Sequence, residues 1–123
     1  MKEVYEQIGE TGLRELVAAF YRRVKEDDLL GPMYPESDWH GAEERLADFL
    51  VYRFGGSQKY IEERGHPRLR MRHMPFRIGE AERDRWLQLM GKAMVEQTIT
   101  EPAAGLLKDF FVQTADFMRN QGG

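Results

Sequence analysis

Residues 64–76, which read RGHPRLRMRHMPF, are the stretch from which the rest of this chain is best understood. They hold two of the three histidines, and their prolines and Gly65 interrupt any long regular helix. His73 stands among apolar residues, with Arg70 and Arg72 close by in an otherwise acidic chain. An imidazole in an apolar slot beside fixed positive charge suits a flat apolar ligand that carries a metal and has anionic edges. Haem is such a ligand.

Three other interpretations of this stretch stay open on its residues alone. His73 can be a structural histidine near a helix end, which is the commoner use of a lone histidine. The alternating arginines at 68, 70 and 72 can form the solvent face of a short strand. They can also form a phosphate-binding patch. The rest of the chain has to distinguish these interpretations.

Composition limits the class of protein. A chain of 123 residues is long enough for one domain with a real core, and we expect residues 1–123 to form it. A net charge of -3 argues against general nucleic-acid binding, and without cysteine there is no disulfide framework, thiolate nucleophile or zinc–thiolate site. No apolar run approaches a membrane span, and the N-terminus lacks the apolar region of a signal peptide. We therefore expect a soluble cytoplasmic protein with no membrane partner.

Apolar residues recur at spacings of three and four almost throughout, which predicts an all-α fold with about four main helices. No segment shows a convincing strand pair or hairpin turn. Pro35 should hold Tyr34 in an extended conformation. On the last helix the residues predicted to face inward are Leu106, Leu107, Phe110, Phe111, Thr114, Phe117 and Met118. The predicted helical segments are 4–8 (ending at Gly9), about 11–26, about 41–54, one from about 79–80, and one from about 100–102.

Tyr21, Tyr34 and Trp86 carry polar tips on otherwise apolar side chains. Such tips need a hydrogen-bond partner when they are buried. Taken singly, each is most simply a core aromatic residue whose tip reaches water or a backbone carbonyl. Taken together with His73, they favour a shared ligand pocket.

Several short motifs are distributed along the chain: Phe20-Tyr21, Tyr34-Pro35, GAEERL at 41–46, Gly55-Gly56, residues 64–73, PFRI at 75–78, and Trp86. In these motifs the chain resembles the group II truncated haemoglobins over nearly its whole length, and the central block is the most specific part. The resemblance implies a two-over-two helical sandwich, the truncated globin fold, around haem b.

The resemblance implies a role for individual residues. His73 matches the proximal ligand of the iron. Tyr21, Tyr34 and Trp86 match the distal cluster around bound oxygen, and Ala42 stands where many globins carry a distal histidine.

Other positions match contacts of the cofactor. Leu46 and Phe49 match apolar contacts on the distal side, whereas Arg45, Tyr60 and Arg72 match partners of the haem propionates. The resemblance places four further residues against the cofactor: Leu69, Phe76, Ile78 and Met90.

Three functions follow as hypotheses. The first is a haem protein that binds oxygen and other diatomic ligands tightly. The second is an enzyme, a peroxidase or nitric oxide dioxygenase, that uses the same pocket. The third is a haem-free helical interaction module, which the absence of a Soret band would reveal. The sequence does not separate the first two, does not identify a reductase as electron donor, and leaves the oligomeric state open, a homodimer included.

Overall fold

The computed structural model describes residues 2–55, 62 and 78–119. Over these ranges the chain forms four α-helices and two short 3-10 helices and contains no strand, which confirms the predicted all-α fold. No helix within the same ranges is both long enough and apolar enough to cross a membrane.

The first helix, α1 (Lys2–Glu26), is divided at Gly9, where φ of 65° and ψ of -175° are not helical. A positive φ of this kind is easy for glycine and strained for other residues, so the predicted end of the short N-terminal segment is confirmed. The longer part of α1 buries one face, as the spacing predicted. The residues of that face are Leu13, Leu16, Val17, Phe20, Tyr21 and Val24.

Two 3-10 turns, η1 (Gly31–Met33) and η2 (Glu36–Asp38), connect α1 to α2 (Trp39–Arg53). Between them Tyr34 is extended, with φ of -111° and ψ of 134°, as expected for a residue before proline. After α2 the chain turns at Gly55, whose φ is 98°. The end of α2 agrees with the prediction, and its beginning lies two residues earlier.

The other pair of helices is α5 (Glu80–Glu96) and α6 (Ala103–Phe117). The predicted beginning of α5 is confirmed, and the Glu82 carboxylate accepts a hydrogen bond of 2.7 Å from the Gly79 N–H there.

One inward prediction on α6 is wrong, because Phe117 is 60% exposed. The buried row of α6 includes Leu107, Phe111, Ala115 and Met118, at spacings of four, four and three. Phe117 is one position before Met118 and therefore points about 100° away from it around the helix axis.

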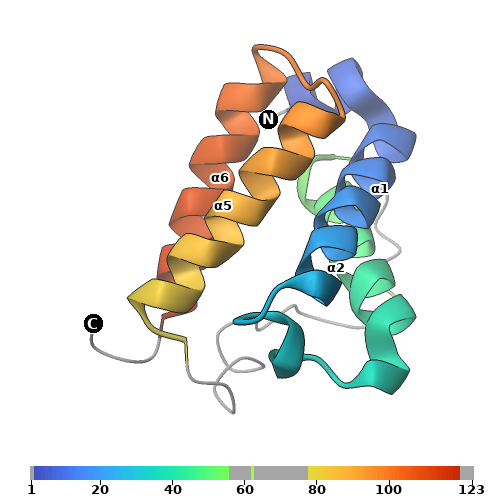
Figure 1. The fold of residues 1–123 in the computed structure, drawn as a ribbon. Coiled ribbons are helices and arrows are strands. Elements are labelled where there is room, and N and C mark those ends of the chain that lie inside the picture. The colour runs from blue at the N-terminus through green and yellow to red at the C-terminus, as the bar shows by residue number, and fades with distance from the viewer. Residues whose placement is uncertain (1, 56–61, 63–77, 120–123) are drawn as a thin grey trace.

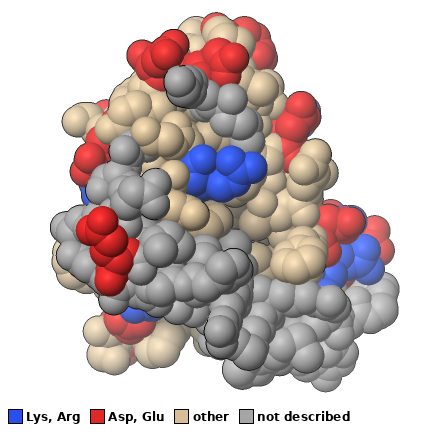
Figure 2. All heavy atoms as spheres, turned by 180° about the vertical axis from the view of Figure 1, so that it is seen from behind, with Lys and Arg blue, Asp and Glu red and all other residues tan. Residues whose placement is uncertain are grey.

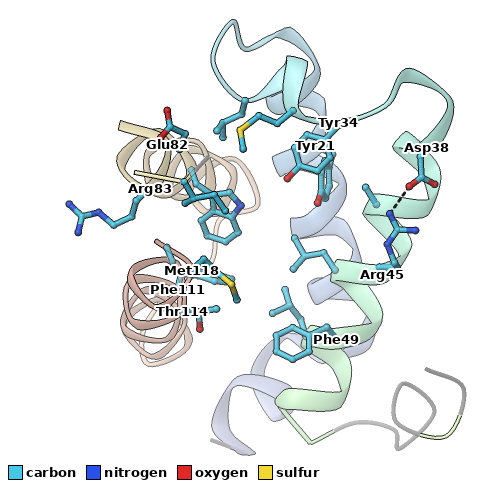
Figure 3. A pocket seen from close by; sticks show the side chains of 18 of the residues that line it. Tyr21, Tyr34, Asp38, Arg45, Phe49, Glu82, Arg83, Phe111, Thr114 and Met118 are labelled. Atoms are coloured by element: carbon cyan, nitrogen blue, oxygen red, sulfur yellow. Dashed lines mark hydrogen bonds and ion pairs between the residues drawn. The ribbon is translucent and has the colours of Figure 1, made fainter. Parts of the chain in front are cut away.

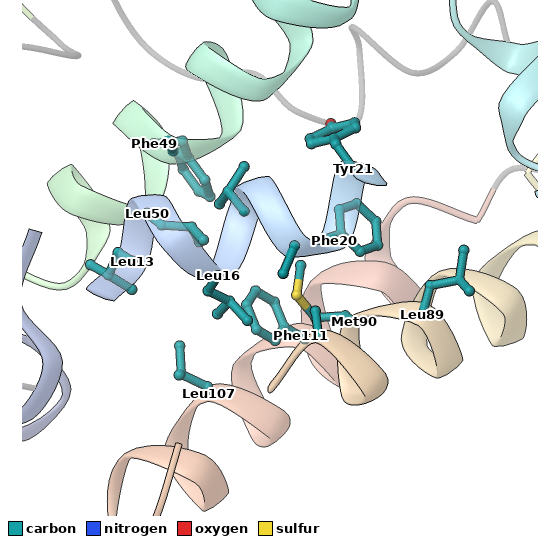
Figure 4. Packing of buried hydrophobic residues seen from close by; sticks show 14 of the residues in the cluster. Leu13, Leu16, Phe20, Tyr21, Phe49, Leu50, Leu89, Met90, Leu107 and Phe111 are labelled. Carbon is teal, nitrogen blue, oxygen red and sulfur yellow. The ribbon is translucent and has the colours of Figure 1, made fainter. Parts of the chain in front are cut away.

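The helices form two pairs that face each other (Figure 1): α1 lies beside α2, and α5 beside α6. Helix α1 contacts α2, α5 and α6, so its buried face is the centre of the core. Figure 4 shows Leu16 and Phe20 of α1 packed near Met90 and Phe111 of the opposite pair. This arrangement is the two-over-two sandwich expected from the sequence.

Candidate functional site

A cavity of about 420 Å³ lies between the two pairs of helices (Figure 3). Its wall is mostly apolar and draws on α1, the α1–α2 connection, α2, α5 and α6. Many of the residues that sequence reasoning singled out meet on this wall. They are Tyr21, Tyr34, Ala42, Arg45, Leu46, Phe49, Ile78 and Trp86.

Tyr21 and Tyr34 lie side by side at one end of the cavity (Figure 3). Tyr21 comes from α1 and Tyr34 from the extended link after η1, and their ring centroids are 5.6 Å apart with an interplanar angle of 89°. Such an edge-to-face contact is a favourable aromatic geometry. The two phenol groups therefore hold each other at the cavity wall.

Trp86 reaches the same cavity from α5. Its ring lies 4.9 Å from that of Phe20 and 5.4 Å from that of Phe111, measured between centroids. Phe20 in turn lies 5.1 Å from Tyr21. Phe20 thus joins Trp86 to Tyr21, and Tyr21 in turn contacts Tyr34, so the rings restrict one another's movement.

The environment keeps both phenols protonated at neutral pH. Burial raises the pKa of Tyr21 well above its usual value, and the neighbouring Tyr34 phenol raises it further. Burial also raises the pKa of Tyr34, although the Tyr21 hydroxyl and the Arg45 guanidinium partly offset that effect. A protonated phenol can donate a hydrogen bond to a ligand in the cavity.

Helix α2 contributes a small residue and a guanidinium that pairs with a carboxylate of η2. Ala42 is buried and, as an alanine, offers no hydrogen-bonding side chain. Arg45 donates a 2.6 Å hydrogen bond to Asp38 at the rim (Figure 3). A side chain at Gly41 would overlap Asp38 Oδ1, so glycine is what lets this pair lie against the helix.

Helix α6 supplies a cavity wall that sequence reasoning did not identify. Phe110, Phe111, Thr114, Ala115 and Met118 all line the cavity. All but Ala115 had been predicted to face inward, but as core residues. Glu82 and Arg83 of α5 and Leu30, Met33 and Pro35 of the α1–α2 connection also line it and had no predicted role there.

The remaining predicted site residues divide into two groups. Met90 is only 1% exposed but belongs to the core, and it is not part of the cavity wall. His73, Tyr60, Leu69, Arg72 and Phe76 lie outside the described residues, so their roles stay predictions. Over the described ranges, no group of three or more His, Cys, Asp or Glu side chains is arranged to hold a metal ion.

Comparisons with known proteins agree with this geometry. The bacterial-like globin family matches residues 3–120. The curated group 2 truncated hemoglobin YjbI of Bacillus subtilis is 46% identical over 90 residues, which cover 73% of this chain and 67% of the relative.

Two solved structures are similar over almost the whole chain. The hemoglobin of Chloroflexus aurantiacus has a TM-score of 0.91 and 44% identity, covering 96% of this chain and 98% of that one. A truncated oxygen-avid haemoglobin from Bacillus subtilis has a TM-score of 0.90 and 39% identity, covering 95% and 98%.

Two facing pairs of helices with an aromatic cavity between them are a shortened globin fold. Since both the family match and the relatives cover most of the sequence, the chain belongs to the bacterial-like globin family, as a group II truncated haemoglobin.

Membership of the globin family implies a haem, and the described residues suit one. Apolar side chains of α2 and α6, such as Leu46 and Phe111, offer surface for a flat macrocycle. Arg45 is a guanidinium at the cavity rim, of the kind that binds carboxylates by forked hydrogen bonds. Tyr21, Tyr34 and Trp86 bring polar tips to the same cavity. The side chains on the described part of the wall therefore fit a haem.

Proposed function

We propose that this protein is a cytoplasmic haem b protein that binds oxygen and related diatomic ligands tightly. One observation carries the proposal: three aromatic side chains with donor tips, Tyr21, Tyr34 and Trp86, come from three different elements to one apolar cavity. Bound haem supplies an iron, for which we propose His73 as the protein ligand, and diatomic ligands bind at such an iron.

The work of the chain is to hold the ligand. A preorganised donor in a dry pocket stabilises developing negative charge by about 1–3 kcal/mol. Each 1.4 kcal/mol is about a factor of ten in affinity, so two or three such donors would slow ligand release by orders of magnitude. The ring contact of Trp86 with Phe20, which also contacts Tyr21, supports this role, because it fixes the indole relative to the tyrosines before a ligand arrives.

In this proposal, α2 gives the ligand access to the cavity. Ala42, Leu46 and Phe49 present no donor, and the small Ala42 leaves room in the first turn of the helix. A diatomic ligand could then enter past α2 and meet the donors on the other elements. The solved Bacillus subtilis haemoglobin is described as oxygen-avid, and the likeness to it supports tight binding here.

The arginines, in this proposal, serve the propionates of the haem. Arg45 lies at the cavity rim, and we assign Arg72 and Tyr60 the same role from the sequence resemblance. On the described part of the face in Figure 2, acidic and basic side chains are mingled and form no continuous basic stripe. The net charge of -3 favours propionate binding over nucleic-acid binding for the arginines. Arg72→Ala should speed haem transfer to an apo-globin acceptor, and DNA binding should be weak and abolished by physiological salt.

Peroxide and nitric oxide are further ligands that the same donors suit. A donor that stabilises charge on bound oxygen would also polarise a peroxide bond. Either activity would need a reductase or another electron donor to return the protein to its starting state.

The proposal is tested by loading the purified protein with haem and recording absorbance and oxygen dissociation. A Soret band together with slow oxygen release supports it. A protein that takes up no haem would instead be a helical interaction module. Turnover with peroxide or nitric oxide, measured on the same preparation, decides whether enzymatic chemistry accompanies binding.

A further inference from the structure

A carboxylate whose side chain is mostly shielded from solvent joins the connection after α1 to the helix that carries Trp86. Asp27 follows α1 directly, and its side chain is only 9% exposed. Its Oδ2 atom accepts hydrogen bonds from the Leu29 N–H at 3.0 Å and the Leu30 N–H at 2.9 Å. Its Oδ1 atom accepts a 2.6 Å hydrogen bond from Arg85 of α5.

Each partner of this ion pair is close in sequence to one of the proposed donors. Leu30 is buried and lines the cavity, and the short η1 turn that follows it leads to Tyr34. The Tyr34 N–H closes that turn with a 3.2 Å bond to the Gly31 carbonyl. At the other end, Arg85 is the residue before Trp86. Asp27 therefore stands between the segment that presents one donor and the helix that presents another.

The contact differs from an ordinary surface ion pair. Exposed ion pairs contribute little, because water screens them and the side chains lose freedom. Here the Asp27 side chain is only 9% exposed, and both of its oxygens accept hydrogen bonds, one from the backbone of the connection and one from a guanidinium. Charge-assisted hydrogen bonds of this kind fix geometry as well as adding energy. Arg85 also donates to Asp28 at 3.1 Å, so the guanidinium binds two successive residues of the connection.

We infer that Asp27 and Arg85 form a positioning clamp, which sets the placement of Tyr34 relative to Trp86 and thereby the rate of ligand release. This inference rests on the proposed function, because it assumes that Tyr34 and Trp86 donate to the ligand. Neither clamp residue lines the cavity, so both act through the residues that do. Breaking the clamp frees the η1 segment from α5 and widens the range of positions open to the Tyr34 hydroxyl.

The chain offers a matched control for this test. Arg22 of α1 pairs with Glu96 of α5, so it also joins α1 to α5 by an ion pair. Arg22 is 59% exposed, and neither partner lines the cavity. Arg22→Gln therefore removes one of the two ion pairs that Glu96 makes with α1, the other being with Arg23, without touching the connection that carries Tyr34.

The experiment compares Arg85→Gln, Asp27→Asn and Arg22→Gln in the haem-loaded protein, with Arg85→Lys as the conservative rescue. We expect both clamp variants to release oxygen several-fold faster and to exchange the Leu29 and Leu30 amide hydrogens faster. Arg85→Lys should recover part of both effects, and Arg22→Gln should show neither. If the clamp variants lowered only the thermal midpoint, as Arg22→Gln would, the clamp would be structural and the inference would fail.

A double variant separates the clamp from the proposed function. Arg85→Gln added to Tyr34→Phe should change oxygen release by less than about twofold, because the clamp acts through the Tyr34 hydroxyl and coupled residues give non-additive effects. A full additional effect in that background would overturn the clamp, since it would then act independently of Tyr34. If Trp86→Phe alone left oxygen release unchanged, the proposed donor role would fail. If Trp86→Phe alone speeds release and Arg85→Gln does not, only the clamp is rejected.

Discussion

Two parts of the cavity use similar aromatic side chains for different purposes. The donor cluster, Tyr21, Tyr34 and Trp86, brings three polar tips to the cavity. The apolar wall, Phe110, Phe111, Ala115 and Met118 of α6, brings none. Figure 3 shows the labelled tyrosines across the cavity from Phe111 and Met118. A polar tip in a dry place costs free energy unless it finds a partner. The Tyr21 and Tyr34 hydroxyls hydrogen-bond to each other, and we propose that the tips of the donor cluster also serve a bound ligand, whereas the apolar wall sets only the shape of the cavity.

The largest expected effect concerns haem binding, on which both parts of the cavity depend. His73→Ala should abolish stable haem binding, because no other residue of the sequence combines an imidazole with apolar neighbours and adjacent arginines. Expression with added haem should give a weak or shifted Soret band. A normal five-coordinate ferrous spectrum would show that another residue holds the iron.

The next effect should appear in the donor cluster. Trp86→Phe keeps an aromatic ring against Phe20 and Phe111 but removes the indole N–H. We expect oxygen release at least about tenfold faster, equivalent to about 1.4 kcal/mol of lost stabilisation, and faster autoxidation. The smaller ring should also lower the free energy of unfolding by about 1–3 kcal/mol. Stopped-flow oxygen dissociation and thermal melting report these two effects separately.

A change in the apolar wall should lower stability but leave oxygen release almost unchanged. Phe111→Leu keeps an apolar side chain on α6 while changing its shape, so we expect the free energy of unfolding to fall by about 1 kcal/mol. Oxygen release should stay close to that of the unchanged protein, because no donor is lost. A denaturant titration run beside the dissociation measurement checks both expectations.

Tyr34→Phe should have a smaller effect on oxygen release than Trp86→Phe. Tyr21 lies against Tyr34, and its hydroxyl hydrogen can rotate toward the ligand and replace the lost donor. The double variant with Tyr21→Phe provides the control, since it removes that replacement. A single variant as fast as Trp86→Phe would mean that Tyr34 is the principal donor.

The smallest effect is a pH dependence of the clamp. Burial raises the pKa of Asp27, but hydrogen bonds from Leu30, Arg85 and Leu29 outweigh it and leave the pKa below the usual 3.8. A lowered folded-state pKa contributes stability that is present above pH 3.8 and lost as pH falls through the folded value. The stability difference between the unchanged protein and Asp27→Asn should therefore shrink in acid. A difference that stayed constant down to acid pH would contradict this pKa.

Helix periodicity predicted the fold well because burial repeats with the turn of the helix. The inward residues of α1 are a clear example, since Leu13, Leu16 and Phe20 are all fully buried. The inward prediction for Phe117 was wrong, because its helix ends there and the buried row continues to Met118 instead. A direction inferred from spacing is least reliable in the last turn of a helix.

The site was predicted in part, and the reasons differ by residue. The resemblance identified the donor cluster, which the structure brings together at the cavity. Periodicity placed Phe110 and Phe111 inward, but spacing cannot distinguish a residue that faces a cavity from one that faces another side chain. Spacing alone could not distinguish Met90, which lies in the core, from Trp86, which lines the cavity.

Long-range contacts were beyond the sequence altogether. Asp27 was interpreted only as part of a helix terminus. Its hydrogen bond to Arg85 spans 58 positions of the chain, and no local pattern marks either partner. Only the three-dimensional packing of the α1–α2 connection against α5 reveals it.

The most direct test of the account is the oxygen dissociation rate of Trp86→Phe measured beside that of Phe111→Leu. The two residues contact each other and line the same cavity, but only one carries a donor. We predict a rate at least about tenfold higher for Trp86→Phe and a change of less than about twofold for Phe111→Leu. Equal changes in the two variants would contradict the account, because packing alone would then govern ligand release.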